Sequence, residues 1–109
     1  KVIRSPAGAK TETAAMAHWM IGETYFHQKN YEAAKRTFLA VEILYDYPKW
    51  QAAALLEAAK CCQLLGQQKE AVELYTRIIN HYRDTPYAEL AAQALRNQEA
   101  RTKPSGSGK

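Results

Sequence analysis

Residues 31–45 read YEAAKRTFLAVEILY and residues 68–82 read QKEAVELYTRIINHY, and these two stretches decide the fold. Both place apolar side chains at intervals of four, three and four residues, which is the spacing of one face of an α-helix. The positions are Ala34, Phe38, Val41 and Tyr45 in the first stretch and Ala71, Tyr75, Ile78 and Tyr82 in the second. Each residue of the second set follows its counterpart by 37 residues. A fixed period of this size indicates stacked units built from the same helical elements.

Short polar segments and prolines divide each unit into two helices. Residues 28–30 and 66–68 read as turns, and Gly66 suits the position after a helix end where φ is positive. Pro48 and Pro86 fall where a new helix begins, because a proline in the first turn sacrifices no helical hydrogen bond. The sequence therefore predicts helices near 13–28, 31–46, 49–65, 69–83 and 86–101.

The length of 109 residues fits one domain with flexible ends. Residues 1–12 and 102–109 mix Pro, Gly, Ser and charge without a period, and we expect a flexible lead-in and a flexible tail. The predicted domain, 13–101, divides into a unit at 13–48, a unit at 49–85 and a capping helix at 86–101. Thr85 is predicted to cap that last helix. Because the chain opens at Lys1 without Met, we expect a fragment or a processed product.

The last helix is predicted to cover the second unit with one face and to meet solvent with the other. The inward residues are Ala88, Ala92 and Leu95, and the outward residues are Glu89, Gln93 and Arg96. Helical stacks need a terminal helix with such a polar back to stay soluble.

The net charge of +4 lies in the ends of the chain. Residues 14–100 hold nine Lys and Arg against ten Asp and Glu. A nucleic-acid groove needs clustered basic side chains on the folded face, so we expect no nucleic-acid partner. The sequence also lacks a run of about 18 apolar residues, so we expect no direct membrane insertion.

The sequence carries no motif for catalysis or for metal binding. It contains no G-x-G-x-x-G, P-loop or H-E-x-x-H pattern, and every serine lies in the predicted lead-in or tail. His18 and His27 are nine residues apart, so they point to opposite sides of a helix and form a poor metal site. Cys61 and Cys62 are adjacent without a second pair, which favours small buried residues over a zinc or redox site. We therefore expect a protein that is not an enzyme, with no catalytic residue, metal or cofactor.

The two units resemble the tetratricopeptide repeat family, whose signature is W-x₂-L-G-x₂-Y, then A-x₃-F, then P. The first unit reads His18-x₂-Ile21-Gly22-x₂-Tyr25, then Ala34-x₃-Phe38, then Pro48, and the second reads Leu55-x₂-Ala58-Ala59-x₂-Cys62, then Ala71-x₃-Tyr75, then Pro86. Trp19 stands one place after the signature tryptophan, and the units are 37 or 38 residues long instead of 34. The resemblance covers about residues 14–100. It implies an all-α, right-handed α-α superhelix of two helical hairpins plus a C-terminal capping helix, with Gly22 and Ala59 allowing close helix approach.

The junctions between helices resemble those of bacterial cell-envelope repeat proteins. The segments that carry this resemblance are Tyr45-Asp46-Tyr47-Pro48 and the stretch HYRDTPYA at 81–88. The families in question include the periplasmic coordinator of the Tol-Pal system and a lipoprotein of the outer-membrane β-barrel assembly machinery. This resemblance implies a scaffold in the periplasm or cell envelope of a bacterium, while a cytoplasmic location stays open.

The family resemblance also implies a concave groove lined by the first helix of each unit. It places Met16, Trp19, Glu23, Phe26 and His27 there from the first unit, and Ala53, Leu56, Lys60, Gln63 and Leu64 from the second. Exposed Trp and Met side chains suit the burial of a partner's apolar side chains. In chaperone cofactors of this family, basic residues bind a C-terminal carboxylate. Trp19 and Glu23 stand in those places here, so we expect no carboxylate binding.

The predicted function is a non-catalytic protein–protein interaction scaffold that binds a peptide or a partner helix in this groove. The first helix is apolar on more than one side, at Met16, Trp19, Met20, Ile21, Tyr25 and Phe26. Something is therefore expected to cover it: earlier repeats, the N-terminal segment or a second copy. The alternatives to the groove are a structural oligomerisation module that uses this helix, or an accessory repeat segment of a larger multidomain protein.

Overall fold

A computed structural model describes residues 11–102 of the chain, which form five α-helices and no strand. The helices are α2 (Glu12–His27), α3 (Tyr31–Leu44), α4 (Pro48–Leu64), α5 (Gln68–His81) and α6 (Pro86–Thr102). Each predicted helix boundary lies within two residues of the observed one, which confirms the all-α fold. Of the predicted lead-in and tail, only residues 11, 12 and 102 are described, and residues 12 and 102 belong to α2 and α6.

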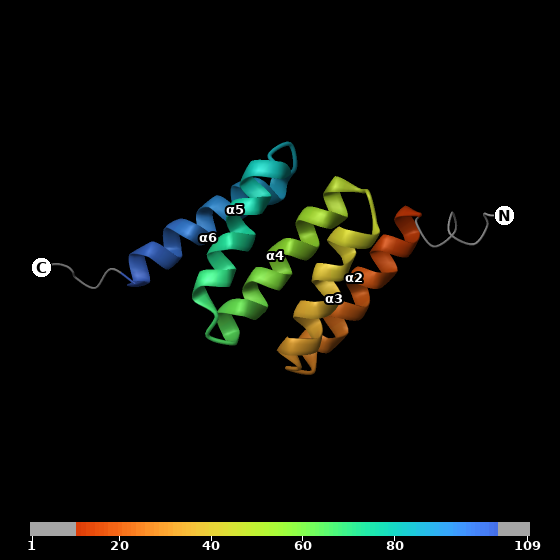
Figure 1. Ribbon diagram of the computed structural model, residues 1–109, viewed down its shortest axis with the longest axis horizontal. Helices are drawn as coiled ribbons and strands as arrows, with labels where there is room; N and C mark the ends of the chain where they lie inside the picture. The colour runs from red at the N-terminus through yellow and green to blue at the C-terminus, as the bar shows by residue number, and fades with distance from the viewer. Residues whose placement is uncertain (1–10, 103–109) are drawn as a thin grey trace, which may run out of the picture.

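The five helices form two antiparallel hairpins followed by a single helix, stacked side by side (Figure 1). Within the stack, α2 contacts α4 and α4 contacts α6, so these three helices share an inner layer. The helices α3 and α5 form the outer layer, and α4 packs against both of them. The helix α4 is therefore surrounded, whereas α2 lies at one edge of the stack.

For four of the five described helices, the residue before the helix or its first residue explains where the helix begins. The side chains of Thr11 and Asn30 accept hydrogen bonds from amide nitrogens three residues later, at 3.1 and 3.4 Å, and cap α2 and α3. Proline occupies the first position of α4, at Pro48, and of α6, at Pro86. Both prolines stand where the sequence predicts a helix start.

Thr85 precedes α6, but its hydroxyl does not act as the predicted cap. The hydroxyl donates to the Tyr82 carbonyl at 2.7 Å, and the Thr85 carbonyl accepts from the Ala88 amide at 3.2 Å. The side chain therefore stabilises the turn that ends the second unit, because its hydroxyl donates to a carbonyl of that turn.

Both hairpin turns contain one residue with a positive φ. Gly66 has a φ of 80°, as predicted for the residue after a helix end. Lys29, the equivalent residue 37 positions earlier, has a φ of 63° although it carries a side chain. Because this region costs a side-chain-bearing residue about 1 kcal/mol relative to glycine, the first turn is strained where the second is not.

The core lies between the layers and uses the faces that the sequence predicts. Ala34, Phe38 and Val41 on α3 are fully buried, and so are Ala71, Tyr75 and Ile78 on α5, with Tyr75 only 1% exposed. Burying a side chain such as that of Phe38 contributes about 2–3 kcal/mol. The repeated pattern of four, three and four residues is thus a repeated buried surface.

Gly22 lies where α2 approaches the side chain of Phe38 on α3 closely. A Cβ atom at this position would lie 2.6 Å from Cε1 of Phe38, whose side chain is fully buried. At the equivalent position of the second hairpin, Ala59 is buried and fits beside Tyr75. The expected role of these two small residues in helix packing is confirmed for Gly22, where any side chain would overlap the ring.

The helix α6 covers the second hairpin with an apolar face. Ala88 and Leu95 pack against the core as expected, whereas Ala92 is only half-buried and does not belong to the core cluster. Ala91, which the sequence reasoning missed, is fully buried. The predicted outward residues Glu89, Gln93 and Arg96 are exposed. The expected orientation of the capping helix is therefore confirmed.

Two ion pairs between consecutive units have the same separation in the sequence. The Lys35 ammonium lies 3.5 Å from the Glu70 carboxylate, and the Arg77 guanidinium lies 2.8 Å from the Glu42 carboxylate. In both pairs the partners are 35 residues apart, two fewer than the repeat period. The sequence reasoning missed these pairs, although the period together with opposite charges at this offset could have revealed them.

Candidate functional site: the inner layer of helices

The inner layer formed by α2, α4 and α6 contains three hollows between neighbouring helices. Two lie between α2 and α4, and one lies between α4 and α6. Their volumes are about 260, 320 and 180 Å³, so each is small for a drug-sized ligand but large enough for an amino-acid side chain. This layer is where the sequence places the predicted groove.

The first hollow lies at the start of α2 and α4. Met16, which is 39% exposed, lines it together with Trp50. The indole nitrogen of Trp50 donates to Glu12 at 3.1 Å, and the Lys49 ammonium lies 5.3 Å from the centre of the Trp50 ring. The aromatic ring is thus held in place by a hydrogen bond and a cation–π contact.

The second and third hollows lie on either side of Lys60. The second is lined by Phe26 and Leu64, with Gln63 and Lys60 at its polar side. The third is lined by Leu56, Leu90, Ala94 and Tyr75 among others. Because Lys60 borders both, the two hollows form one continuous surface across α2, α4 and α6.

Four ionisable side chains form a cluster beside the second hollow, which one of them, Lys60, lines. The His27 imidazole lies 3.7 Å from the Glu23 carboxylate, and the Lys60 ammonium lies 3.4 Å from the Glu57 carboxylate. Burial, and then the neighbouring Glu57 carboxylate, raise the pKa of Glu23 above its usual value. With a neutral imidazole this cluster carries two negative charges and one positive charge, so it favours a cationic group over a carboxylate.

Trp19 does not lie in the groove as an exposed side chain, contrary to expectation. Its ring packs 6.2 Å from the Phe38 ring and 5.8 Å from the Trp50 ring, measured between centroids. Its indole nitrogen is buried without a hydrogen-bond partner among the described residues. Gly22, three residues later, lies close to the same Phe38 ring. The Trp19 ring therefore packs against the Trp50 ring and offers little surface to a ligand.

Gln63 connects the inner layer to the outer one. Its amide oxygen accepts from the Tyr75 hydroxyl at 3.0 Å, and its amide nitrogen donates to the Gln98 amide oxygen at 2.9 Å. Gln98 is only 8% exposed, and it again lies 35 residues after its partner. The sequence reasoning named Gln63 but missed Tyr75, Leu90 and Gln98, since it assigned no groove residues to α6.

Five of the eight predicted site residues line the hollows, and two more lie in the charged cluster. Met16, Phe26, Leu56, Lys60 and Gln63 line the hollows, while Glu23 and His27 belong to the cluster. Leu56 is only 6% exposed, so it forms the floor of its hollow. Trp19 is the member that the structure places outside the groove surface.

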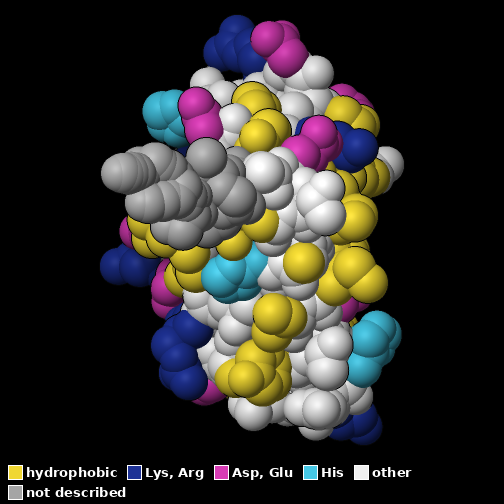
Figure 2. Space-filling model, turned by 90° about the vertical axis from the view of Figure 1, so that its right-hand side faces the viewer, with side chains coloured by type: hydrophobic (Ala, Val, Ile, Leu, Met, Phe, Trp, Pro, Cys, Tyr) yellow, Lys and Arg dark blue, Asp and Glu magenta, His cyan; other side chains and the backbone are white. Residues whose placement is uncertain are grey.

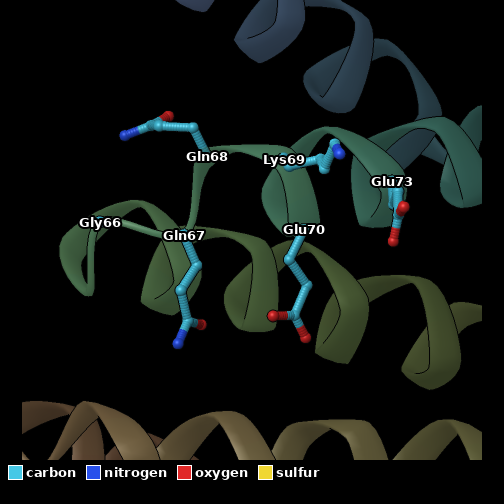
Figure 3. A pocket seen from close by; sticks show the side chains of 6 residues that line it. All are labelled: Gly66, Gln67, Gln68, Lys69, Glu70 and Glu73. Atoms are coloured by element: carbon cyan, nitrogen blue, oxygen red, sulfur yellow. The ribbon is translucent and has the colours of Figure 1, made fainter.

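A further hollow lies at the turn between α4 and α5 and is lined only by polar residues and Gly66 (Figure 3). Figure 3 shows Gln67 and Glu70 pointing to one side of the turn and Gln68 pointing to the other. Both Gln67 and Glu70 contact the Lys35 ammonium of α3, at 2.8 and 3.5 Å. These side chains are therefore engaged in the contact between units, which explains their arrangement.

The described residues offer little support for a nucleophilic cysteine or a metal site. Cys61 and Cys62 are fully buried, and burial raises the pKa of Cys61 to about 12 and that of Cys62 to about 11. Both thiols are therefore protonated at neutral pH, and a protonated thiol is a poor nucleophile. Among residues 11–102 no group of three or more His, Cys, Asp or Glu side chains is placed to hold a metal ion. No helix in this range is long and apolar enough to cross a membrane.

Comparison with known families gives one match, and that match covers most of the folded chain. A family model described as tetratricopeptide repeat matches residues 12–84, which span α2 to the junction before α6. Neither the curated proteins nor the solved structures contain a match to the chain. Repeats of this family generally mediate protein–protein interaction and are generally non-catalytic. Two hairpins with a common buried face and the matched family model lead to the same conclusion: the chain belongs to the tetratricopeptide repeat family.

Proposed function

We propose that this protein is a non-catalytic scaffold that binds a peptide or a partner helix along the inner layer of α2, α4 and α6. The observation that carries this proposal is the continuous surface around Lys60, where two partly apolar hollows lie side by side. A side chain of the ligand would occupy each hollow. Binding of this kind needs no catalytic group, in agreement with the buried thiols.

The charges in the groove indicate the kind of ligand. Two carboxylates, from Glu23 and Glu57, lie near one ammonium from Lys60, and burial, followed by the Glu57 carboxylate, raises the pKa of Glu23. A Lys or Arg side chain on the ligand would relieve this repulsion, whereas a terminal carboxylate would increase it. We therefore propose a ligand with a basic residue flanked by apolar ones.

Selection from a displayed peptide library, followed by affinity measurements on variants, tests this function. Leu64 and Leu90 are 55% and 45% exposed and lie in different hollows, so Leu64→Glu and Leu90→Glu should leave the fold intact. Each is expected to weaken selected peptides at least tenfold. Val72→Glu, at a 38% exposed position on the outer helix α5, is the matched control and should have no effect. Equal affinity for all three variants, or enrichment of peptides without basic residues, contradicts the proposal.

The cell-envelope setting is also part of this proposal, supported by the junction segments at 45–48 and 81–88. Fractionation of the source cells with an antibody to the chain provides the test. Recovery with cytoplasmic markers alone would contradict it.

A further inference from the structure

The side-chain amide of Gln63 is held at two of its atoms by residues that are themselves buried. Its oxygen accepts from the Tyr75 hydroxyl at 3.0 Å, and its nitrogen donates to the Gln98 amide oxygen at 2.9 Å. Tyr75 is 1% exposed and Gln98 is 8% exposed. Burial raises the pKa of Tyr75 to about 12, so the hydroxyl keeps its proton at neutral pH. The amide of Gln63 is therefore fixed in one orientation before any ligand binds.

The same amide retains unused hydrogen-bonding capacity. A primary amide has two N–H donors and an oxygen with two lone pairs, and these two bonds use one of each. Gln63 is half-buried and lines the second hollow, so the remaining N–H and the remaining lone pair are open to a ligand there. One free donor beside one free acceptor is complementary to the C=O and N–H groups of a peptide main chain.

The first unit has no equivalent of this chain of hydrogen bonds. The residues 37 positions before its three members lack amide and hydroxyl groups: they are Phe26, Phe38 and Cys61. The three polar residues therefore occur together in the second unit alone. A buried polar group is costly unless it is paired, so a chain in which each group holds the next favours a defined position for Gln63 at its less buried point.

Three other side-chain amides line the two hollows beside Lys60, but none of them is held in this way. Gln68 lies in the second hollow, and Gln93 and Asn97 lie in the third. All three are exposed, and their side chains make no hydrogen bond to another described residue. Immobilising a free side chain on binding costs conformational entropy. Gln63, which is already immobile, is therefore the stronger contact for a ligand.

The position of Gln63 makes the main chain of the ligand the group that it meets. Gln63 lines the second hollow, and its partner Tyr75 lines the third. A ligand with one side chain in each hollow must therefore pass its main chain near Gln63. An extended segment presents free N–H and C=O groups there. The main-chain groups of a helix are already bonded to one another, so a helix could not use this contact.

The apolar edge of the stack at α2 lacks such a group. Figure 2 shows hydrophobic side chains along this edge, and Met20 and Ile21 of α2 are 53% and 51% exposed. The helix α2 contains no Asn or Gln, and its Thr24 hydroxyl donates to the Met20 carbonyl of the same helix at 3.1 Å. This edge therefore offers apolar contact without a fixed amide, which assigns main-chain recognition to the inner layer.

We propose that Gln63 binds the main chain of an extended ligand segment, and that Tyr75 and Gln98 are positioning residues for its amide. This inference rests on the proposed function and selects one of its two ligand classes, an extended peptide instead of a partner helix. The ligand places one side chain in the second hollow and one in the third, and the peptide bond between them lies on Gln63.

An ester scan of a peptide selected from the displayed library tests the main-chain contact on the unaltered protein. Each peptide bond is replaced in turn by an ester, which lacks the N–H and has a weaker carbonyl acceptor. Replacement between the residues that fill the two hollows should weaken binding about tenfold. With Gln63→Leu the unmodified peptide should lose a similar factor, and the ester should have little further effect. A scan without a sensitive bond, or an equal ester effect in both proteins, overturns the proposal.

Tyr75→Phe tests the positioning role, because it removes the hydroxyl and keeps the ring. It should weaken the unmodified peptide about threefold and also reduce the effect of the ester, which a general loss of stability would not do. Tyr82→Phe is the matched control, since the Tyr82 hydroxyl donates to Glu42 in the outer layer at 3.0 Å, and it should change neither quantity. An ester effect that stays undiminished in Tyr75→Phe would show that Tyr75 does not position Gln63.

The conformation of the bound peptide gives a result that needs no variant. Nuclear magnetic resonance of the isotope-labelled peptide in the complex should show an extended backbone. A helical bound peptide overturns this inference and leaves the proposed function standing, because a partner helix is its other ligand class. If the library yields no binding peptide at all, both fail.

Discussion

Replacing Gly22 by alanine tests whether the closest contact in the first hairpin limits its stability. The added Cβ atom would lie 2.6 Å from Cε1 of Phe38 and 2.8 Å from two further atoms of the same ring. Carbon atoms in contact are normally about 3.5–4.0 Å apart, so the ring or the helix must move by about 1 Å. The ring cannot move freely, because it is fully buried and packs against Trp19.

The expected magnitude follows from two opposing effects. Overpacking a buried site costs about 1–3 kcal/mol. Alanine is favoured over glycine within a helix by about 1 kcal/mol, which offsets part of that cost. We therefore expect Gly22→Ala to lower the free energy of unfolding by about 1 kcal/mol. For a domain of this size the melting temperature should fall by about 4–8 °C.

A double-mutant cycle with Phe38→Leu isolates the contact. Urea unfolding followed by circular dichroism gives the free energy of unfolding for each of the four proteins. With the ring removed, Gly22→Ala should become neutral or stabilising, because only the helix preference remains. Ala59→Gly is the reciprocal control in the second hairpin, where the methyl group fits, and it should destabilise. If Gly22→Ala stabilises the wild type, or costs the same in both backgrounds, the close-contact explanation is wrong.

Three further measurements test separate features of the structure. Lys29→Gly should raise the free energy of unfolding by about 0.5–1 kcal/mol, because it removes a side chain from a backbone with positive φ, and an unchanged urea midpoint would contradict this. Glu42→Ala should cost about 1–2 kcal/mol and lower the pKa of Tyr82 from about 12, since the carboxylate accepts the Tyr82 hydroxyl at 3.0 Å; an unchanged tyrosine absorbance titration would refute it. Because Cys61 and Cys62 have pKa values raised to about 12 and 11, their burial stabilises the fold below about pH 9 and this stability is lost as the pH rises through 11 and 12. Thiol alkylation should therefore be slow in the native protein and fast in urea, and a urea midpoint that stays constant above pH 9 would contradict the assigned burial.

The helices and the core were predictable because they depend on local spacing. The pattern at Ala34, Phe38 and Val41 places three side chains on one face of a helix, and any helix with such a face must bury it. The prolines at 48 and 86 mark helix starts for an equally local reason. These features can be predicted without knowing which other part of the chain packs against them.

The groove was predictable only in part, because it depends on how neighbouring helices meet. Trp19 was expected on the surface, yet its ring packs against the Phe38 ring, to which Gly22 also lies close. Leu90 and Gln98 were missed because no local pattern on α6 shows which side of it meets α4. The distance of 35 residues between partners such as Gln63 and Gln98 carries this information. This separation predicts a contact only once the repeat period and the stacking of the helices are both known.

One departure of the second unit from the family signature, a tyrosine in place of phenylalanine, also helps to shape the groove. Tyr75 stands where the first unit has Phe38, and its hydroxyl reaches through the hairpin to the Gln63 amide oxygen. Gln63 in turn donates to Gln98, so a single chain of hydrogen bonds links α5, α4 and α6. A phenylalanine at this position could bury as much surface but could not hold Gln63, and Gln63 borders the hollow beside Lys60. In the second unit, Tyr75 thus adds to the apolar contact a hydrogen bond to Gln63, and through Gln63 it helps to fix the position of α6 against the proposed binding surface.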